Sequence, residues 1–336
     1  MKESFDYTIL AFAGGVGGAK LALGLAGLLD PEHLTIAVNT GDDFEHLGLR
    51  ISPDLDTVMY TLAGLANPET GWGLIGESWN SLDALGRLGG ETWFRLGDRD
   101  LATHIERTRR LRAGETLSLV TRHFCRSLGV MADVIPMTDD PVRTVVHTDE
   151  GALPFQEYFV HRRCEPRVRD FEFAGITSAK PLPQLLERLA QADALIYCPS
   201  NPYVSIAPII SLPGVRSLIA SRRSAGMPVV AVSPIVGGAA LKGPAAKMMT
   251  ELGLESTVTA LAKHYAGTIG GLVIDRVDAA AAPHIESVGI RTLVTETVMK
   301  TDEDKMRLAR ETVEFAKSLM RHGDGETGRQ GDKETD

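Results

Sequence analysis

The N-terminal part of the chain carries the pattern that most restricts the fold: an apolar run, a cluster of glycines, a helical stretch and a second apolar run. Residues 7–13 and 34–38 have the composition of buried strands, and residues 19–29 place leucines along one helical face. Strand, loop, helix and strand within about 30 residues form a βαβ unit. The pattern therefore predicts the opening of a doubly wound α/β sheet.

The same alternation returns in the C-terminal half. Short apolar runs at residues 194–198, 228–233, 271–274 and 291–294 are separated by helical stretches, among them residues 215–224. Residues 302–320 form a last amphipathic helix. Repeated alternation of this kind is typical of a mostly parallel, Rossmann-like sheet with helices on both faces.

The middle of the chain breaks this alternation. Residues 97–128 read as two helices, the first capped by Asp98, and residues 141–175 alternate like antiparallel strands. We therefore predict a Rossmann-like core of residues 1–90 and 181–321, with residues 91–180 inserted as an α+β lid subdomain. Residues 322–336 contain no aliphatic or aromatic side chain, and we expect a disordered tail there.

Composition excludes several classes of protein. Among the 336 residues, 35 are Lys or Arg and 44 are Asp or Glu, so the formal charge is −9. This balance argues against nucleic-acid and membrane-surface partners, which favour a basic excess. The three cysteines are widely spaced and form no CxxC pair, which excludes a disulfide framework. We expect a cytoplasmic protein, and no apolar run reaches the roughly 20 residues of a membrane span.

The glycine cluster after the first strand predicts phosphate binding. Glycines let backbone N–H groups approach an anion, and the following helix adds its positive N-terminal end. Lys20 stands where GxGxxG requires its third glycine, and its neighbours do not complete a P-loop, so neither standard fingerprint is present. The alternative is a tight turn whose glycines serve packing alone. The predicted donor-phosphate residues here are Gly14, Gly15, Gly17, Gly18 and Lys20.

Carboxylates crowd the segment after the second strand. Such a cluster repels itself unless it holds a cation, and Mg²⁺ prefers carboxylate oxygens and water. The alternative is a set of solvated loop acids, with Asp54 capping a helix that begins near Asp56. Five carboxylates fall within 15 residues, against the single cation Arg50: Asp42, Asp43, Glu45, Asp54 and Asp56.

Two further segments carry candidate ligand contacts. Thirteen arginines and no lysine lie between Arg95 and Arg169, and arginine binds phosphates and stacks on planar rings. Arg95 and Arg99, close to the acidic motif, are predicted to contact a ligand. Ser200 and Asn201, after the strand at residues 194–198, would contact a nucleotide, or simply form a turn. We expect a solvated face for four other arginines: Arg107, Arg109, Arg110 and Arg112.

Taken together, these segments resemble the 2-phospho-L-lactate transferase family of deazaflavin coenzyme (factor 420) biosynthesis. The resemblance covers about residues 7–300, and the pairing of Ser-Pro-Asp-Leu-Asp-Thr with Gly-Asp-Arg-Asp at this spacing is its most specific part. The motifs that carry it lie at residues 13–20, 39–43, 52–57, 96–100, 136–141 and 200–202.

The resemblance implies a reaction. A phosphorylated three-carbon acid (2-phospholactate, phosphoenolpyruvate or phosphoglycerate) would move from a guanosine diphosphate ester to the ribityl hydroxyl of the deazariboflavin precursor Fo, releasing GMP. The family implies Mg²⁺ and a homodimer. Asp56 and Arg95 match the positions that contact Fo, and Asp42 matches an acidic position linked to the metal.

Roles within the acidic cluster stay open at this point. Asp56 or Asp42 would orient or deprotonate the hydroxyl, and Asp42, Asp43 and Asp56 are the candidate metal ligands. Two other functions compete: a non-catalytic regulator of a related family that binds a UDP-sugar, and a nicotinamide dehydrogenase, which the broken GxGxxG disfavours.

Overall fold

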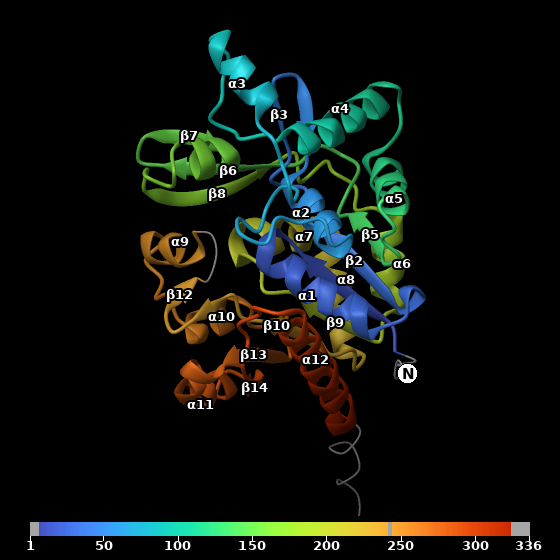
Figure 1. Cartoon of the computed structure of the whole chain (residues 1–336). Coiled ribbons are helices and arrows are strands. Elements are labelled where there is room, and N and C mark those ends of the chain that lie inside the picture. The colour runs from blue at the N-terminus through green and yellow to red at the C-terminus, as the bar shows by residue number, and fades with distance from the viewer. Residues whose placement is uncertain (1–6, 241–243, 324–336) are drawn as a thin grey trace, which may run out of the picture.

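A seven-stranded parallel sheet forms the centre of the computed structural model, which describes residues 7–240 and 244–323 (Figure 1). Its strand order is β14-β13-β10-β9-β1-β2-β5, and every neighbouring pair is parallel. This confirms the predicted Rossmann-like fold class. The strands are β1 (Ile9–Ala13), β2 (Leu34–Val38), β5 (Asp133–Pro136), β9 (Ala194–Tyr197), β10 (Val229–Val232), β13 (Gly271–Asp275) and β14 (Arg291–Thr295).

The burial of strand β1 on both faces explains why its sequence is a continuous apolar run instead of alternating apolar and polar residues. All five of its residues are buried, and they alternate between two core clusters, one on each face of the sheet. A strand covered on both faces needs a continuous apolar run. One face packs against α1 (Gly15–Leu28), α2 (Pro53–Leu62), α5 (Leu117–Ser127) and α12 (Asp302–Gly323). The other packs against α6 (Pro183–Gln191), α7 (Ala207–Ser211), α8 (Val215–Ser224), α9 (Ala245–Glu251) and α10 (Val258–His264).

The middle of the chain forms most of the upper part of the molecule in Figure 1. It contains α3 (Asn80–Arg87), α4 (Asp98–Arg112) and the expected antiparallel sheet, in the order β7-β6-β8. The division of the chain at residues 91 and 180 stays a prediction. One strand inside that range, β5, pairs with β2 and is the edge of the central sheet. The antiparallel strands are β6 (Arg143–Thr148), β7 (Gly151–Pro154) and β8 (Val168–Ala174).

Smaller elements complete the chain. Helix α12 ends at Gly323, and the rest of the predicted disordered tail lies outside the described residues. In the described part of the chain no single helix is long and apolar enough to cross a membrane. Two short helical segments reach that length and composition only as a pair, bent by 86°. The remaining elements are the hairpin β3 (Phe44–His46) and β4 (Leu49–Ile51), β11 (Ile235–Val236), β12 (Ala239–Ala240), α11 (Ala282–Glu286) and the short helices η1 (Pro31–His33), η2 (Glu157–His161), η3 (Pro202–Ile206) and η4 (Arg276–Ala281).

The start of α4 differs from the prediction. Gly97 is its N-cap residue, and Asp98 makes no capping bond to α4. The Asp98 carboxylate instead accepts hydrogen bonds from Ser78 Oγ at 2.6 Å and from the backbone N–H of Ser81 at 2.9 Å, at the start of α3. Glu77 takes the expected role, because its carboxylate accepts two backbone N–H groups in the first turn of α4 at 2.8 Å each. Asp98 therefore joins α3 to α4.

Candidate active site

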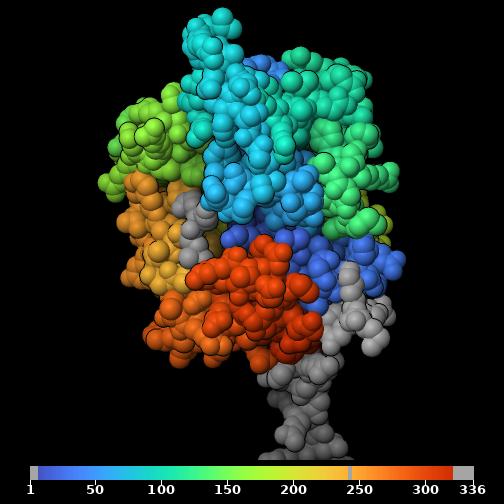
Figure 2. Space-filling view, viewed as in Figure 1, coloured from blue at the N-terminus to red at the C-terminus, as the bar shows by residue number. Residues whose placement is uncertain are grey.

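A cavity of about 1020 Å³ lies where the core meets the middle segment. The loops after β1, β2 and β9 contribute to it, so it stands at the carboxyl ends of parallel strands, the usual ligand site of open α/β sheets. Its walls also include Trp72 from the segment after α2 and Met299 before α12. Figure 2 shows the light blue segment that follows α2 above the red C-terminal segment on the face toward the viewer.

The glycines belong to the first turn of α1, because this helix begins at Gly15, four residues earlier than predicted. Gly15 has φ +61°, and a Cβ on Gly17 would overlap the carbonyl oxygen of Pro199. Close packing against Pro199 thus requires glycine at position 17, in agreement with the alternative that these glycines serve packing. The cavity nevertheless reaches Gly14, Gly15 and Gly17, whereas Gly18 packs against Ser200 instead.

The other predicted donor contacts also lie at this end of the cavity. Lys20 lines it, and its Nζ donates to the carbonyl of Met299 at 2.8 Å. Ser200 and Asn201 line it as well. Ser200 Oγ accepts the Gly14 N–H at 3.1 Å, which fixes the loop after β9 against the start of α1. The start of α1 and the loop after β9, which are far apart in sequence, therefore form one surface.

Three carboxylates of the acidic cluster face the cavity. Asp42, Asp54 and Asp56 line it, and each is at most 6% exposed. Asp54 does not cap its own helix, whose N-cap is Ser52. Its carboxylate accepts the Gly15 N–H at 2.7 Å, so it occupies the N-terminus of α1 instead. The capping alternative for Asp54 is wrong, because α2 begins at Pro53 and places Asp54 within its first turn.

Burial makes this cluster electrostatically unfavourable. It raises the pKa of Asp42 well above its ordinary value, and the neighbouring Asp54 raises it further. Burial likewise raises the pKa of Asp54 to about 6, against hydrogen bonds from Asn39 and Gly15. The pKa of Asp43 is raised to about 7, again by burial, although Ser52 donates to it at 2.7 Å. Arg143 and Arg107 lie close enough to lower the pKa of Asp43, but they do not offset its burial.

The carboxylate oxygens of the cluster meet some of the requirements of a divalent-cation site. Asp42 Oδ1 and Asp43 Oδ1 are buried and have no hydrogen-bond partner among the described residues. Asp43, however, is not a cavity residue, and no three His, Cys, Asp or Glu side chains in the described ranges converge into a metal-holding group. Mg²⁺ commonly takes one or two carboxylates and completes its shell with water and substrate phosphates. Asp42 and Asp54 meet that requirement.

Asp56 is held differently from its neighbours. Both of its oxygens accept hydrogen bonds from Arg107, with one N···O distance of 3.0 Å. Arg107 is 2% exposed, so the prediction of a solvated side chain is wrong for it. Burial alone would lower the pKa of Arg107, but the adjacent Asp56 carboxylate raises it above its ordinary value. Arg109 and Arg110 instead pair with Glu106 on the outer face of α4.

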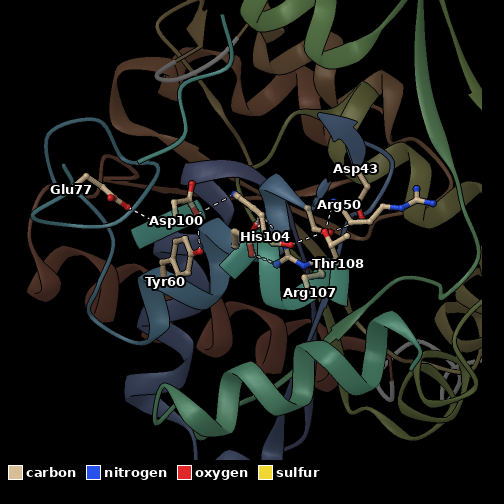
Figure 3. A network of polar contacts seen from close by, with 10 residues as sticks. Asp43, Arg50, Tyr60, Glu77, Asp100, His104, Arg107 and Thr108 are labelled. Atoms are coloured by element: carbon tan, nitrogen blue, oxygen red, sulfur yellow. Dashed lines mark hydrogen bonds and ion pairs between the residues drawn. The ribbon is translucent and has the colours of Figure 1, made fainter. Parts of the chain in front are cut away.

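The buried network continues through His104, as Figure 3 shows. Arg107 Nη1 lies 3.2 Å from His104 Nδ1. A guanidinium only donates, so Nδ1 accepts and neutral His104 carries its proton on Nε2. That nitrogen faces Asp100 Oδ1 at 3.3 Å, and Asp100 Oδ1 also accepts from Tyr60 at 2.7 Å. The network joins α4 to α2 beside the cavity. Tyr60, Asp100 and His104 line the cavity, whereas Arg107 does not.

Comparisons with known proteins identify the family of this chain. A family model described as 2-phospho-L-lactate transferase CofD matches residues 9–317. The chain belongs to this family. A phosphoenolpyruvate transferase of Streptomyces griseus subsp. griseus is 42% identical over 317 residues, 93% of this chain and 99% of the relative. A 2-phospho-L-lactate transferase of Methanosarcina mazei is 38% identical over 301 residues, 90% of this chain and 98% of the relative.

A solved structure shares the fold at much lower identity. The protein BH3568 from Bacillus halodurans superposes with a TM-score of 0.61 at 14% identity, covering 92% of this chain and 100% of that one. This likeness supports the Rossmann-like fold alone. The family assignment confirms the predicted transferase of deazaflavin coenzyme biosynthesis, and none of these comparisons supports the UDP-sugar-binding regulator.

The two residues that match the family's Fo positions both reach the cavity. Asp56 does so from α2, and Arg95 from the segment before α4. The Arg95 guanidinium lies 4.3 Å from the ring centroid of Trp79, so it already stacks on an aromatic face. Arg99 does not line the cavity; it donates to the carbonyl of Ile75 at 2.9 Å.

Apart from Arg95, sequence analysis missed the residues of one wall of the cavity, which we call the lid wall: residues 93–95 and 155–163. Trp93 in the first segment packs against His161 in the second, with ring centroids 5.0 Å apart, and this contact joins the two segments of the lid wall. A helical signal was present in the second segment, where cavity residues recur at i, i+1, i+4, i+5 and i+8, but the strand pattern of residues 141–175 concealed it. The lid-wall residues that line the cavity are Trp93, Phe94, Arg95, Phe155, Gln156, Phe159, Val160 and Arg163.

Proposed function

We propose that this chain transfers a phosphorylated three-carbon acid from a guanosine diphosphate ester to the ribityl hydroxyl of Fo, with release of GMP. One observation carries the proposal: a single cavity brings together the start of α1, a buried carboxylate cluster and an aromatic wall with Arg95. A diphosphate, a divalent cation and a planar acceptor each find suitable chemistry there.

The donor's phosphates would lie at the start of α1. The first N–H groups of a helix have no intrahelical partner and attract anions. Asp54 occupies part of that end, so a phosphate brought there meets a carboxylate. We propose that Asp42 and Asp54 would hold Mg²⁺, which would supply positive charge to neutralise the diphosphate. Lys20, at the same end of the cavity, adds positive charge.

The acceptor hydroxyl would be oriented by Asp56. Because Arg107 engages both of its oxygens, this carboxylate is fixed in position and suited to accept a hydrogen bond from the hydroxyl. The hydroxyl oxygen then attacks the phosphorus that carries the three-carbon acid and its proton passes to the Asp56 carboxylate, while the bond between that phosphorus and the departing GMP oxygen breaks in line. Positioning and charge neutralisation supply most of the catalysis in such transfers. We also propose that the enzyme works as a cytoplasmic homodimer.

An assay of the purified chain tests this function. The protein is incubated with Fo, Mg²⁺ and, in separate reactions, the donors in which GMP is joined through a phosphoanhydride bond to 2-phospholactate, phosphoenolpyruvate or 3-phosphoglycerate. Mass spectrometry should show a phosphodiester of Fo together with one equivalent of GMP, and the productive donor identifies the acid. Absence of product with all three donors, under conditions where the chain binds GDP and Fo, would refute the proposal.

A further inference from the structure

Gln156 has an unusual environment among the residues of the lid wall. It stands at the N-cap position of η2, its side chain is 5% exposed, and it lines the cavity. Its amide forms no hydrogen bond with any other residue in the described part of the chain. Because Gln156 lines the cavity and its amide has no partner among the described residues, the amide is available to pair with a bound ligand.

The surroundings of Gln156 favour a planar ligand. The preceding residue, Phe155, stacks on Phe159 with ring centroids 5.4 Å apart and an interplanar angle of 12°. Both rings line the cavity, as does Trp93, which packs against the same short helix through His161. An aromatic wall of this kind binds flat rings by stacking. The polar group within it then sets which ring edge is accepted.

The carboxamide itself selects the edge. It offers an N–H donor and a C=O acceptor side by side. The complementary edge is a ring lactam, in which a carbonyl lies next to an N–H, because both groups pair at once. A phosphate or carboxylate would use the donor alone and leave the amide oxygen unpaired.

We propose that Gln156 recognises the lactam edge of a substrate ring through this paired hydrogen bond. The inference rests on the proposed function, whose two substrates each supply such a ring: the guanine of the donor and the pyrimidinedione of Fo. Gln156 would therefore be a specificity-determining residue at the lid wall, remote from the phosphates at the start of α1.

Binding measurements on the full chain test the proposal without requiring turnover. Dissociation constants are measured in the presence of Mg²⁺ for Fo, by its fluorescence, and for GDP, by calorimetry. Gln156→Met keeps the volume of the side chain and removes both polar groups. We expect about a 10- to 100-fold weaker binding of one ligand and no change for the other. Gln191→Met, at an exposed glutamine outside the cavity, should change neither.

A second variant identifies the ring. Guanine presents two adjacent donors, N1–H and the 2-amino group, to which both oxygens of a carboxylate can bind. Gln156→Glu should therefore retain GDP affinity if guanine is the ligand. The pyrimidinedione has one N–H between two carbonyls, so a carboxylate faces a carbonyl oxygen and Fo binding should fall at least as far as in Gln156→Met.

Stability separates ligand recognition from a structural role. Replacing an unpaired buried amide with an apolar side chain should leave the unfolding temperature of the ligand-free protein unchanged or raise it. The proposal is overturned if Gln156→Met binds both ligands like the wild type, if it unfolds several degrees lower, or if the wild type binds neither ring. A chain that forms no phosphodiester but loses affinity on this substitution would refute the proposed function alone.

Discussion

The two ends of the cavity are built on different principles. At the carboxyl ends of the parallel strands, which we call the sheet edge, the loops after β1, β2 and β9 bring together glycines, carboxylates and Ser200. Hydrogen bonds from backbone N–H groups, such as that from Gly15 to the Asp54 carboxylate, fix these loops. At the lid wall, ring stacking between segments distant in sequence places aromatic side chains and one unpaired amide. The first end is charged and suited to phosphates and a cation. The second is apolar and suited to rings.

Arg107 holds the Asp56 carboxylate of the first end in position, and its removal should have the largest effect. Arg107→Met leaves the buried Asp56 carboxylate without its partner, which typically costs about 3–5 kcal/mol of unfolding free energy. Urea denaturation followed by circular dichroism measures the change. Arg109→Met, which removes an exposed ion pair with Glu106, should cost at most about 1 kcal/mol.

A double variant sharpens this test. Asp56→Leu combined with Arg107→Met removes both buried charges, so the unfolding free energy should recover much of what Arg107→Met lost. An equal loss in the single and double variants would show that the packing of Arg107, rather than its charge, stabilises the contact between α4 and α2.

The next largest effect concerns the sheet edge alone. Asp42→Asn should lower kcat by about 10²-fold or more, because charge stabilisation at the reacting phosphate is lost. Folding should not suffer, since a buried carboxylate with an unpaired oxygen becomes neutral. Steady-state kinetics across a Mg²⁺ titration measure the loss, and Asp83→Asn on exposed α3 is the control. A kcat within threefold of the wild type would remove Asp42 from the reaction.

Most of the sheet edge could be predicted from sequence, for a physical reason. A strand buried on both faces is a continuous apolar run, and the loop after it carries the chemistry, so Gly15, Asp42 and Ser200 were readable as site residues. The sequence did not reveal which side chains pair with one another. The sequence interpretation placed Arg107 in solvent, because helical charge patterns do not reveal which charged side chain meets a buried carboxylate on another helix.

The lid wall, apart from Arg95, was unreadable for a different reason. Its two segments meet through a ring contact between Trp93 and His161, which are 68 positions apart, and no local pattern encodes such a contact. Gln156 and Phe159 lie on a short helix between two strands, where the alternation of β6 and β8 dominates. Strand β5 was also missed, because it has only four residues and its apolar run is too short to identify a strand of the central sheet.

A smaller effect tests whether the glycines serve only packing. Gly17→Ala places a methyl group against the Pro199 carbonyl, so the start of α1 must shift. We expect a loss of about 1–3 kcal/mol of unfolding free energy and a KM for the donor that rises about tenfold or more, with the KM for Fo unchanged. Gly86→Ala, where the new Cβ meets Thr92 at an ordinary 3.4 Å, is the matched control. Equal increases in both KM values would mean that the two ends are not independent.

The smallest effect is a pH dependence of the sheet edge. Burial raises the pKa of Asp43 from 3.8 to about 7, so the folded state binds a proton more tightly than the unfolded state does. The associated stability is complete below pH 3.8 and is lost as the pH rises through 7. Between pH 8 and pH 6 the ligand-free protein, without Mg²⁺, should gain about 1 kcal/mol. Chemical denaturation at both values measures the gain.

Asp43→Asn decides whether this carboxyl is responsible. The amide cannot titrate, so the variant should be at least as stable as the wild type at pH 8 and should lose most of the difference between pH 8 and pH 6. Exposed acids provide the control: Asp83→Asn should keep the wild-type difference. Were Asp43→Asn to keep it as well, the titration would belong to another carboxyl of the cluster, and Asp42→Asn in the same experiment would identify it, because burial raises the pKa of that carboxyl too.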